Sequence, residues 1–263
     1  MSYGFSDIEF LWWVWGALVA LCWGSFLNVI AFRLVFDVPF FRKRSHCPYC
    51  DRQLVWYELL PLISWVFLRG RCRTCKKTIS WLYPLVEFLS LISFLALAAL
   101  APERYFFAYA LFLSALIITI RTDIESLLIV RYCTLVLIPV GWVCAWQGWL
   151  PLSVAHSVGA TIAGYAVLAL VRWIFFWLTR REGMGQGDLE LLATIGAFTG
   201  FMGVWASLFI ASIFGALVGS ILILSGKAYR DTPIPFGAFL ALGAFMELFL
   251  SFCFHLNIFI FAV

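Results

Sequence analysis

Long runs of apolar residues, separated by short polar stretches, make up most of this chain. A helix that crosses a bilayer needs roughly 17 to 25 apolar residues. Runs that reach or approach this length lie near residues 8–32, 81–101, 105–120, 132–150, 152–178, 189–203, 204–225 and 236–263, and the sixth of them is short. The pattern predicts an all-α polytopic membrane protein with about eight transmembrane helices.

A sizeable polar insert separates the first two apolar runs. We therefore expect a first transmembrane helix in 1–32, a small cytoplasmic loop domain in 33–80 and a seven-helix membrane domain in 81–263. The first helix is expected to be retained in the mature protein. Asp7 and Glu9 stand where a cleavable signal peptide carries a basic segment.

The composition agrees with a bilayer environment. Hydrophobic residues account for 64% of the chain and charged residues for 12%, and the mean hydropathy is +0.99. These values exclude an ordinary soluble domain. A net charge of +4 would suggest a nucleic acid or an anionic surface as the partner of a soluble protein. Here the positions of the charges explain it, and no nucleic acid partner is expected.

The distribution of Lys and Arg predicts the orientation in the membrane. If the amino terminus lies outside, nearly all basic residues fall in the inner segments, which are the insert, 121–131, 180–181 and 227–230. Arg172 lies just inside the fifth run, and Arg104 is the exception. Because Lys and Arg accumulate in short cytoplasmic loops, both termini are expected on the outer side of the membrane.

Four of the eight cysteines form two pairs in the insert, Cys47-Pro-Tyr-Cys50 and Cys72-Arg-Thr-Cys75. Two such pairs, about twenty residues apart, are typical of a zinc ribbon. Four thiolates close the coordination sphere, so a bound Zn²⁺ would be structural. Two unmetallated thiol turns are the alternative, and His46 is close enough in sequence to compete as a ligand. The other cysteines lie in apolar runs, where a buried thiol is the default interpretation.

Two aspartates mark the expected cytoplasmic beginnings of spans, Asp123 and Asp188. Either one alone has a plain alternative, since acidic residues often cap helix amino termini. Asp188, however, follows Gly183, Gly185 and Gly187, which free the backbone to pack closely or to adopt positive φ. An extended peptide could then approach the carboxylate.

Two carboxyl groups in a partly dehydrated site tend to share one proton. The ionised aspartate then takes a proton from water while its protonated partner polarises the scissile carbonyl, as in aspartic proteases. The sequence does not assign these two roles. A serine triad is poorly supported, because the three histidines are scattered along the chain at His46, His156 and His255.

Taken together, the motifs resemble the type IV prepilin peptidase family of Gly-x-Gly-Asp membrane aspartyl proteases. The resemblance covers nearly the whole chain. It rests on Gly24-Ser-Phe-Leu-Asn28 through Arg33, the two cysteine pairs, Leu60-Pro61-Leu-Ile-Ser64, Gly70-Arg-Cys72, Ile79-Ser80, Tyr83-Pro84 through Glu87, Asp123, Gly185-Gln-Gly187-Asp188, Pro235-Phe-Gly237 and Leu240-Ala-Leu-Gly243.

The resemblance implies a bacterial inner-membrane enzyme with periplasmic termini. It implies cleavage of the basic leader of prepilins or pseudopilins, which serve type IV pili or type II secretion, on the cytoplasmic side. It also implies N-methylation of the new amino terminus with S-adenosylmethionine, because members with a large cysteine-bearing loop usually have both activities. A peptidase without methyl transfer is the alternative. Asn28 and Glu87 fall on matching family positions and are the candidates for the methyltransferase site.

Two departures from the family pattern concern charge. The family often has Pro and an acidic residue where this chain has Val130 and Arg131, and it often has Lys where this chain has Glu190. We also expect acids, namely Glu125, Asp188 and Glu190, to hold the basic leader, because the cysteine-bearing loop is itself basic and would repel it.

Two further functions fit the composition, a proton-coupled transporter and a scaffold for pilus assembly. The transporter is disfavoured because both aspartates are expected at the membrane edge and no inverted repeat is evident. A scaffold should tolerate substitution of Asp123 or Asp188, and a peptidase should not. The sequence names neither the prepilin nor an oligomeric state.

Overall fold

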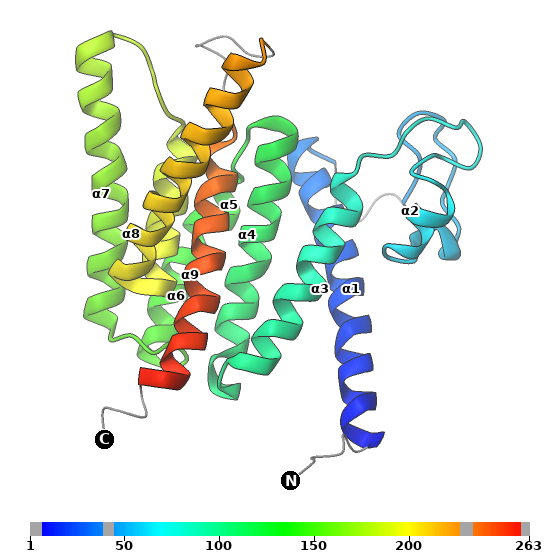
Figure 1. The fold of residues 1–263 in the computed structure, drawn as a ribbon, viewed down its shortest axis with the longest axis horizontal. Coiled ribbons are helices and arrows are strands. Elements are labelled where there is room, and N and C mark those ends of the chain that lie inside the picture. The colour runs from blue at the N-terminus through cyan, green and yellow to red at the C-terminus, as the bar shows by residue number, and fades with distance from the viewer. Residues whose placement is uncertain (1–6, 39–44, 227–233, 259–263) are drawn as a thin grey trace. The chain divides into compact units, whose positions relative to one another are not determined.

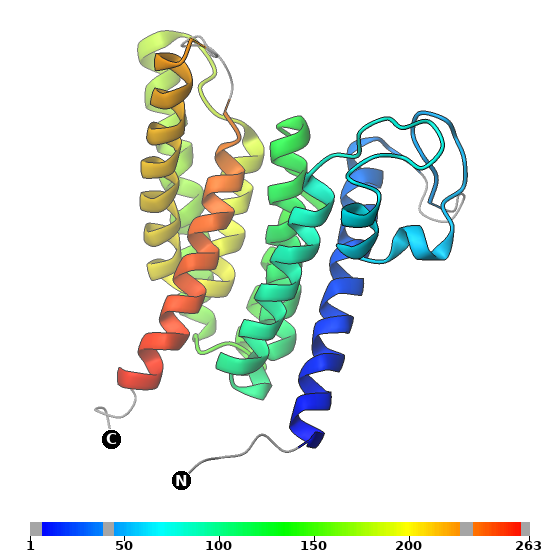
Figure 2. The same ribbon diagram turned by 45° about the vertical axis from the view of Figure 1, so that its right-hand side comes forward.

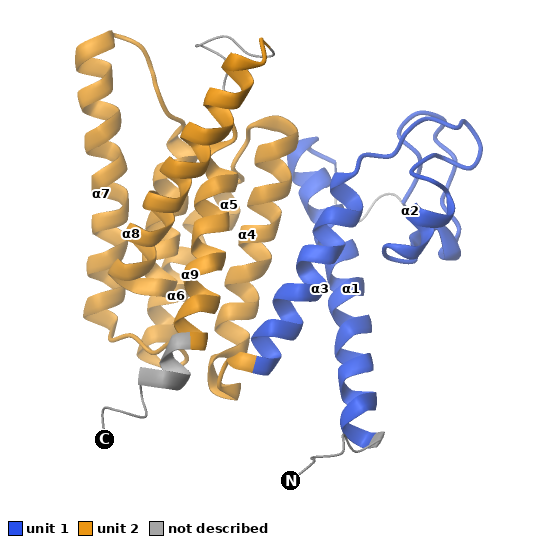
Figure 3. Cartoon of the chain, viewed as in Figure 1, with its two compact units in different colours: residues 1–99 blue, residues 100–263 orange. Residues whose placement is uncertain are grey.

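The computed structural model describes residues 7–38, 45–226 and 234–258. The basic residues expected at 42–44 and 227–230 lie outside these ranges. The chain divides into two compact units, residues 1–99 and 100–263 (Figure 3). The described residues form helices and no named strand, which confirms the predicted all-α class.

The first unit contains two long helices and the cysteine-bearing loop between them (Figure 1). The long helices are α1 (Asp7–Val35) and α3 (Leu82–Leu100), and the loop carries two short elements, η1 (Trp56–Leu59) and α2 (Ile63–Phe67). Gly24 allows α1 and α3 to approach closely, since a Cβ there would lie 2.8 Å from the Ser90 side chain.

The second unit is a helical bundle (Figures 1 and 2). Its elements are η2 (Glu103–Tyr105), α4 (Phe106–Ser126), α5 (Arg131–Leu135), α6 (Leu137–Trp146), α7 (Val154–Thr179), α8 (Gln186–Leu224) and α9 (Phe236–Ile258). Across both units, six described helices are long and apolar enough to cross a membrane, and the pair 131–146 is apolar but shorter. The exact count of eight spans stays a prediction.

The 39-residue helix α8 reverses direction at Gly200, where φ is 71° and ψ is −164°. This backbone conformation is open to glycine and strained for other residues. Before the break α8 runs antiparallel to α7, since Gly164 meets Leu192 and Gly196 meets Ala160. After the break it runs antiparallel to α9, since Gly203 meets Glu247 and Gly243 meets Ser207.

Both ends of α8 therefore lie at the upper end of the second unit in Figures 1 and 2. The two arms of α8 correspond to the sixth and seventh predicted spans. The boundary predicted between 203 and 204 was three residues late. Hydropathy does not change across this region, and the turn depends on a single glycine conformation.

Candidate active site

Asp123 lies in the last turn of α4, which continues to Ser126. This corrects the expectation that Asp123 begins a span: it ends one. Leu127, in the left-handed conformation, closes α4 by donating its N–H to the Asp123 carbonyl. The Asp123 side chain is buried, and its Oδ2 accepts a 2.8 Å hydrogen bond from the N–H of Ala238. The N–H of Gly237 donates to the same carboxyl group.

Asp188 lies in the first turn of α8, as predicted, and is also buried. Its carboxyl group accepts a hydrogen bond from the N–H of Gly185, the residue that caps the helix. Each aspartate thus faces a helix amino terminus, Asp188 that of α8 and Asp123 that of α9. Such ends present free N–H groups and the positive end of the helix dipole, which stabilise a negative charge.

Ile129 packs between the two motifs that carry these contacts. A Cβ at Gly187 would lie 2.7 Å from the Cβ of Ile129, and one at Gly237 would lie 2.5 Å from its Cδ1 and 3.1 Å from Oδ2 of Asp123. At Gly187 the neighbouring atom is a Cβ, which moves only with the backbone, so this position requires glycine for packing. At Gly237 the nearest atom is the end of the Ile129 side chain, so a larger residue there would have to displace Ile129 and crowd the Asp123 carboxyl group. Of the two uses foreseen for the glycines before Asp188, the structure shows close packing, because positive φ is absent at Gly183, Gly185 and Gly187.

The structure brings Asp123 and Asp188 together. Their carboxyl groups are close enough to repel each other when both are ionised. The residues join from segments 65 positions apart in sequence, the end of α4 and the beginning of α8. Two buried acids that repel across a short distance can lower their energy by holding one proton between them.

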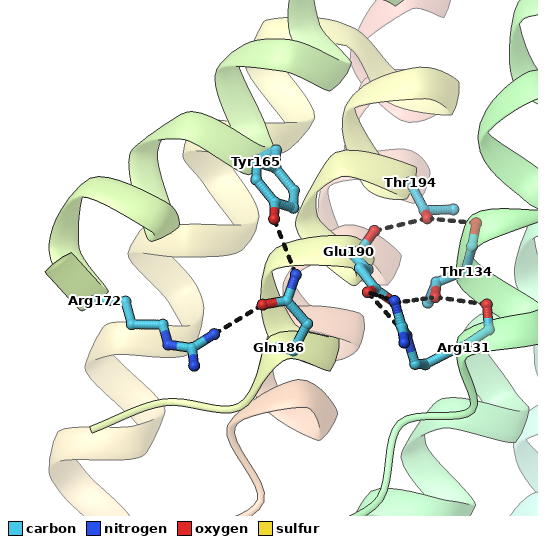
Figure 4. Close-up of polar contacts among 7 residues, drawn as sticks. All are labelled: Arg131, Thr134, Tyr165, Arg172, Gln186, Glu190 and Thr194. Carbon is cyan, nitrogen blue, oxygen red and sulfur yellow. Dashed lines mark hydrogen bonds and ion pairs between the residues drawn. The ribbon is translucent and has the colours of Figure 1, made fainter. Parts of the chain in front are cut away.

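Glu190, two residues after Asp188 on α8, is held by residues of α5 (Figure 4). Its carboxylate pairs with Arg131, with the guanidinium Nη2 at 2.8 Å from Oε1 and Nε at 3.0 and 3.2 Å from the two oxygens. The hydroxyl of Thr134 donates to Oε2 at 3.4 Å. Arg131 and Glu190, whose charges depart from the family pattern, therefore form one ion pair. Its polarity is the reverse of the family's, which often has an acidic residue at the first position and Lys at the second.

Gln186 fixes the same turn of α8 from the opposite side (Figure 4). Its side-chain amide donates to the Tyr165 hydroxyl at 2.9 Å and accepts from Arg172 at 2.8 Å, and both partners lie on α7. Asp188 stands between Gln186 and Glu190 in sequence. The first turn of α8 is thus tied to α7 and α5 at the residues that flank the aspartate.

The acids expected to hold the leader differ in their surroundings. Glu125 forms an ion pair with Arg121 one turn earlier on α4, at 2.6 Å, and a quarter of its side chain remains exposed. The Glu190 side chain is 3% exposed and already has two partners. Glu125 is therefore accessible to a basic peptide, and Glu190 is not.

The four cysteines of the insert converge in the first unit. Their sulfur atoms all lie within 4.8 Å of one another, and the group does not include His46, which faces Asp51 at 3.6 Å. The two turns have matching hydrogen bonds, from Cys47 N–H to the Arg52 carbonyl at 2.9 Å and from Cys72 N–H to the Lys77 carbonyl at 2.8 Å.

This geometry fits a tetrahedral metal ion. With Zn–S bonds of about 2.3 Å, the sulfur atoms of a tetrahedron stand about 3.8 Å apart. The Cys47 and Cys75 sulfurs are separated by 3.8 Å. Hydrogen bonds from the N–H groups of Cys75 and Thr74 lower the pKa of the Cys72 thiol to about 6. Burial and hydrogen bonds with the neighbouring thiols raise the pKa of Cys75 to about 11, so Cys72 is the more readily ionised thiol of this pair.

The candidates for methyl transfer, Asn28 and Glu87, lie along the contact between α1 and α3. The Asn28 amide donates to the Tyr83 carbonyl at 3.1 Å. The Glu87 carboxyl group accepts the N–H of Leu62 at 2.7 Å and a hydrogen bond from the Ser25 side chain. Both residues thus hold the first unit together.

Several contributors to the site were not foreseen from the sequence. They are Thr134, Tyr165, Arg172 and the backbone N–H groups of Gly237 and Ala238. One signal was present, since Arg131 and Glu190 depart from the family in opposite directions of charge. Two departures of opposite charge in one chain indicate that the two residues contact each other.

The fold and the site define a polytopic helical membrane protein with two buried carboxyl groups brought near each other, the arrangement of a membrane aspartic peptidase. Comparison with known families agrees. The "Bacterial Peptidase A24 N-terminal domain" matches residues 18–101, and the "Type IV leader peptidase family" matches residues 110–220. The chain belongs to the type IV leader peptidase family, which confirms the resemblance noted in the sequence.

Curated relatives match over most of their length. A "Prepilin leader peptidase/N-methyltransferase" of Aeromonas hydrophila is 35% identical over 264 residues, covering 90% of this chain and 91% of the relative. One of Pectobacterium carotovorum is 33% identical, covering 91% and 94%. A "Type 4 prepilin-like proteins leader peptide-processing enzyme" of Escherichia coli O78:H11 is 30% identical, covering 87% and 90%. No solved structure matches significantly.

Proposed function

We propose that this protein is an aspartic endopeptidase that removes the basic leader of type IV prepilins or pseudopilins, and that it N-methylates the new amino terminus. The observation that carries the proposal is the pair of buried carboxyl groups, Asp123 and Asp188, each at a helix amino terminus. The family assignment and the names of the relatives support the substrate class and the second activity.

The hydrogen bonds suggest how the pair divides its roles. Two backbone N–H groups donate to Asp123 and one donates to Asp188. Negative charge is therefore better stabilised on Asp123, which would act as the base that takes a proton from water. Asp188 would hold the shared proton and donate a hydrogen bond to the scissile carbonyl. No covalent intermediate is needed.

The second unit also supports an orientation. Among its described basic residues, Arg121 lies near the end of α4 that carries Asp123, and Arg131 begins α5 shortly after it. Arg180 and Arg181 lie between α7 and the start of α8, which carries Asp188. Arg104 instead precedes the opposite end of α4. By the positive-inside tendency the end with the two aspartates faces the cytoplasm of a bacterial inner membrane, with the termini in the periplasm. The leader's basic residues would meet Glu125 there. Glu190, which the sequence also suggested, would position Asp188 instead.

The residues present fit zinc better than they fit S-adenosylmethionine. The four sulfur atoms fit Zn²⁺, which would fold the cysteine-bearing loop into a small domain and leave no open coordination position. For S-adenosylmethionine the fit is not supported, since Asn28 and Glu87 are engaged with backbone and side-chain partners. Methyl transfer therefore rests on the relatives' names, and no step is assigned to these residues.

The test is incubation of the purified protein with a prepilin and a labelled methyl donor, with cleavage and label transfer measured separately. We expect cleavage, followed by label on the new amino terminus. Cleavage without label would support the peptidase activity and contradict the methyltransferase activity. Loss of both in a monodisperse, helical preparation would favour the transporter or the assembly scaffold.

Metal analysis of the same preparation is expected to find about one zinc ion per chain. Cys47→Ser should release the metal and make the loop between α1 and α3 susceptible to protease, because the tetrahedral site loses a ligand. Cys144→Ser, in the apolar helix α6, is the matched control and should keep the metal. A metal-free wild-type protein with four reactive loop thiols would contradict the assignment.

A further inference from the structure

Residues 54–68 of the cysteine-bearing loop are almost entirely apolar, and Glu58 is their one charged residue. The whole insert was predicted to be a cytoplasmic loop domain. Large apolar side chains are exposed on η1, on α2 and on the turn between them: Trp56 by 75%, Leu59 by 42%, Leu60 by 38%, Ile63 by 51%, Val66 by 65% and Phe67 by 83%. We call these six side chains the apolar patch, and exposed large apolar side chains so close together in the chain indicate a contact surface.

Two polar groups of this segment, the Glu58 carboxylate and the Trp65 indole N–H, have partners inside the loop. The Glu58 side chain is 2% exposed, and its carboxylate accepts from Arg52 at 2.6 Å and from the N–H of Val55 at 3.1 Å. These donors hold the pKa of Glu58 below its usual range although burial opposes ionisation. Trp65 points inward, with its indole N–H directed at the Ile79 carbonyl at 3.4 Å. The outward face is left without a charge.

The patch lies alongside the membrane helices. The N–H of Leu62, which precedes α2, donates to Glu87 at 2.7 Å, and α3 begins at Leu82. At a rise of about 1.5 Å per residue, Glu87 is roughly 7–8 Å along the helix from its start. Figures 1 and 2 likewise show η1 and α2 beside the upper part of α1 and α3 and not beyond their ends.

Positive charge follows the apolar segment directly. The next residues carry basic side chains on and around the second cysteine turn, namely Arg69, Arg71, Arg73, Lys76 and Lys77. Arg73 stacks over the Tyr57 ring, with its guanidinium carbon 5.7 Å from the ring centre. An apolar face containing Trp, flanked by basic residues, is the pattern of segments that lie in a membrane interface beside anionic headgroups.

We propose that residues 54–68 lie in the bilayer interface, with Trp56, Ile63, Val66 and Phe67 among the lipid acyl chains and the basic residues at the headgroups. Apolar segments too short to span commonly occupy this position. The tie from Leu62 to Glu87 holds the segment at the corresponding depth of α3. The four-cysteine site is then fixed at the membrane surface. The proposal does not depend on the peptidase activity.

A photo-crosslinking amino acid at position 67 or 56 tests the proposal, in full-length protein reconstituted into vesicles of phosphatidylethanolamine and phosphatidylglycerol. Position 76, on the basic side of the loop, is the control. After irradiation, mass spectrometry should find phospholipid acyl-chain adducts at positions 67 and 56, at least about tenfold above those at position 76.

Adducts of position 67 or 56 with another part of this chain, or with added prepilin, in place of lipid would overturn the proposal. Equal lipid labelling at positions 67 and 76 would overturn it as well, because depth would not then distinguish the apolar and basic sides. Retained metal binding by each substituted protein shows that the loop is folded during the experiment.

Discussion

Replacing either Asp123 or Asp188 with Asn is expected to lower kcat for leader cleavage by about 10³-fold or more, since each variant removes one member of an acid–base pair. Asn is nearly the same size as Asp, so the amide oxygen introduced at position 123 would still accept the N–H of Ala238. Neither variant can share a proton with the remaining acid. KM for the leader should change little in Asp123→Asn, since Asp123 contacts the α9 backbone.

Cleavage of a purified prepilin by the detergent-solubilised variants measures this effect. Glu247→Gln is the matched control, because it removes another acid, which is half-buried and lies more than two turns along α9 from the residues that contact Asp123. It should retain cleavage to within a few-fold. If either aspartate variant cleaved at near wild-type rates, the two-acid mechanism would be wrong, and the result would favour the scaffold hypothesis.

Breaking the ion pair between Arg131 and Glu190 is expected to reduce kcat by about 10- to 100-fold. Arg131→Ala would leave the Glu190 carboxylate buried with the Thr134 hydroxyl as its partner, and an uncompensated buried charge costs several kcal/mol. The first turn of α8 can relieve this cost by shifting toward water. Asp188 lies two residues before Glu190 and would move with it.

The double variant Arg131→Glu/Glu190→Lys restores the pair with the polarity common in the family, and it should recover cleavage to within about threefold. Each single charge reversal should be at least as impaired as Arg131→Ala, because like charges would then face each other. The decisive measurement is the separation of kcat from KM in the four proteins of this cycle.

That cycle also distinguishes two roles for Glu190. If Glu190 held the basic leader, Glu190→Lys would raise KM, and a second change at Arg131 would not restore it. If Glu190 positions Asp188, the loss appears in kcat and the second change recovers it. Burial of Glu190 beneath Arg131 supports the positioning role.

Much of the protein was predictable because it depends on local composition. Apolar runs of spanning length indicated a polytopic helical protein, and the six membrane-length helices agree. The spacing of the cysteines indicated a metal site, since each short turn presents two thiolates by itself. The Gly-x-Gly-Asp motif placed Asp188 at a helix start, where Gly185 caps it.

Tertiary structure decided the features that depend on contacts between distant segments. The reversal at Gly200 leaves hydropathy unchanged, so composition located the hairpin only to within three residues. The partners of Asp123 come from the α9 backbone, which has no side-chain signature. The sign of each charge was evident in the sequence at Arg131 and Glu190. Their neutralisation required α5 to pack against the first turn of α8, because electrostatic energy depends on distance in space and not along the chain.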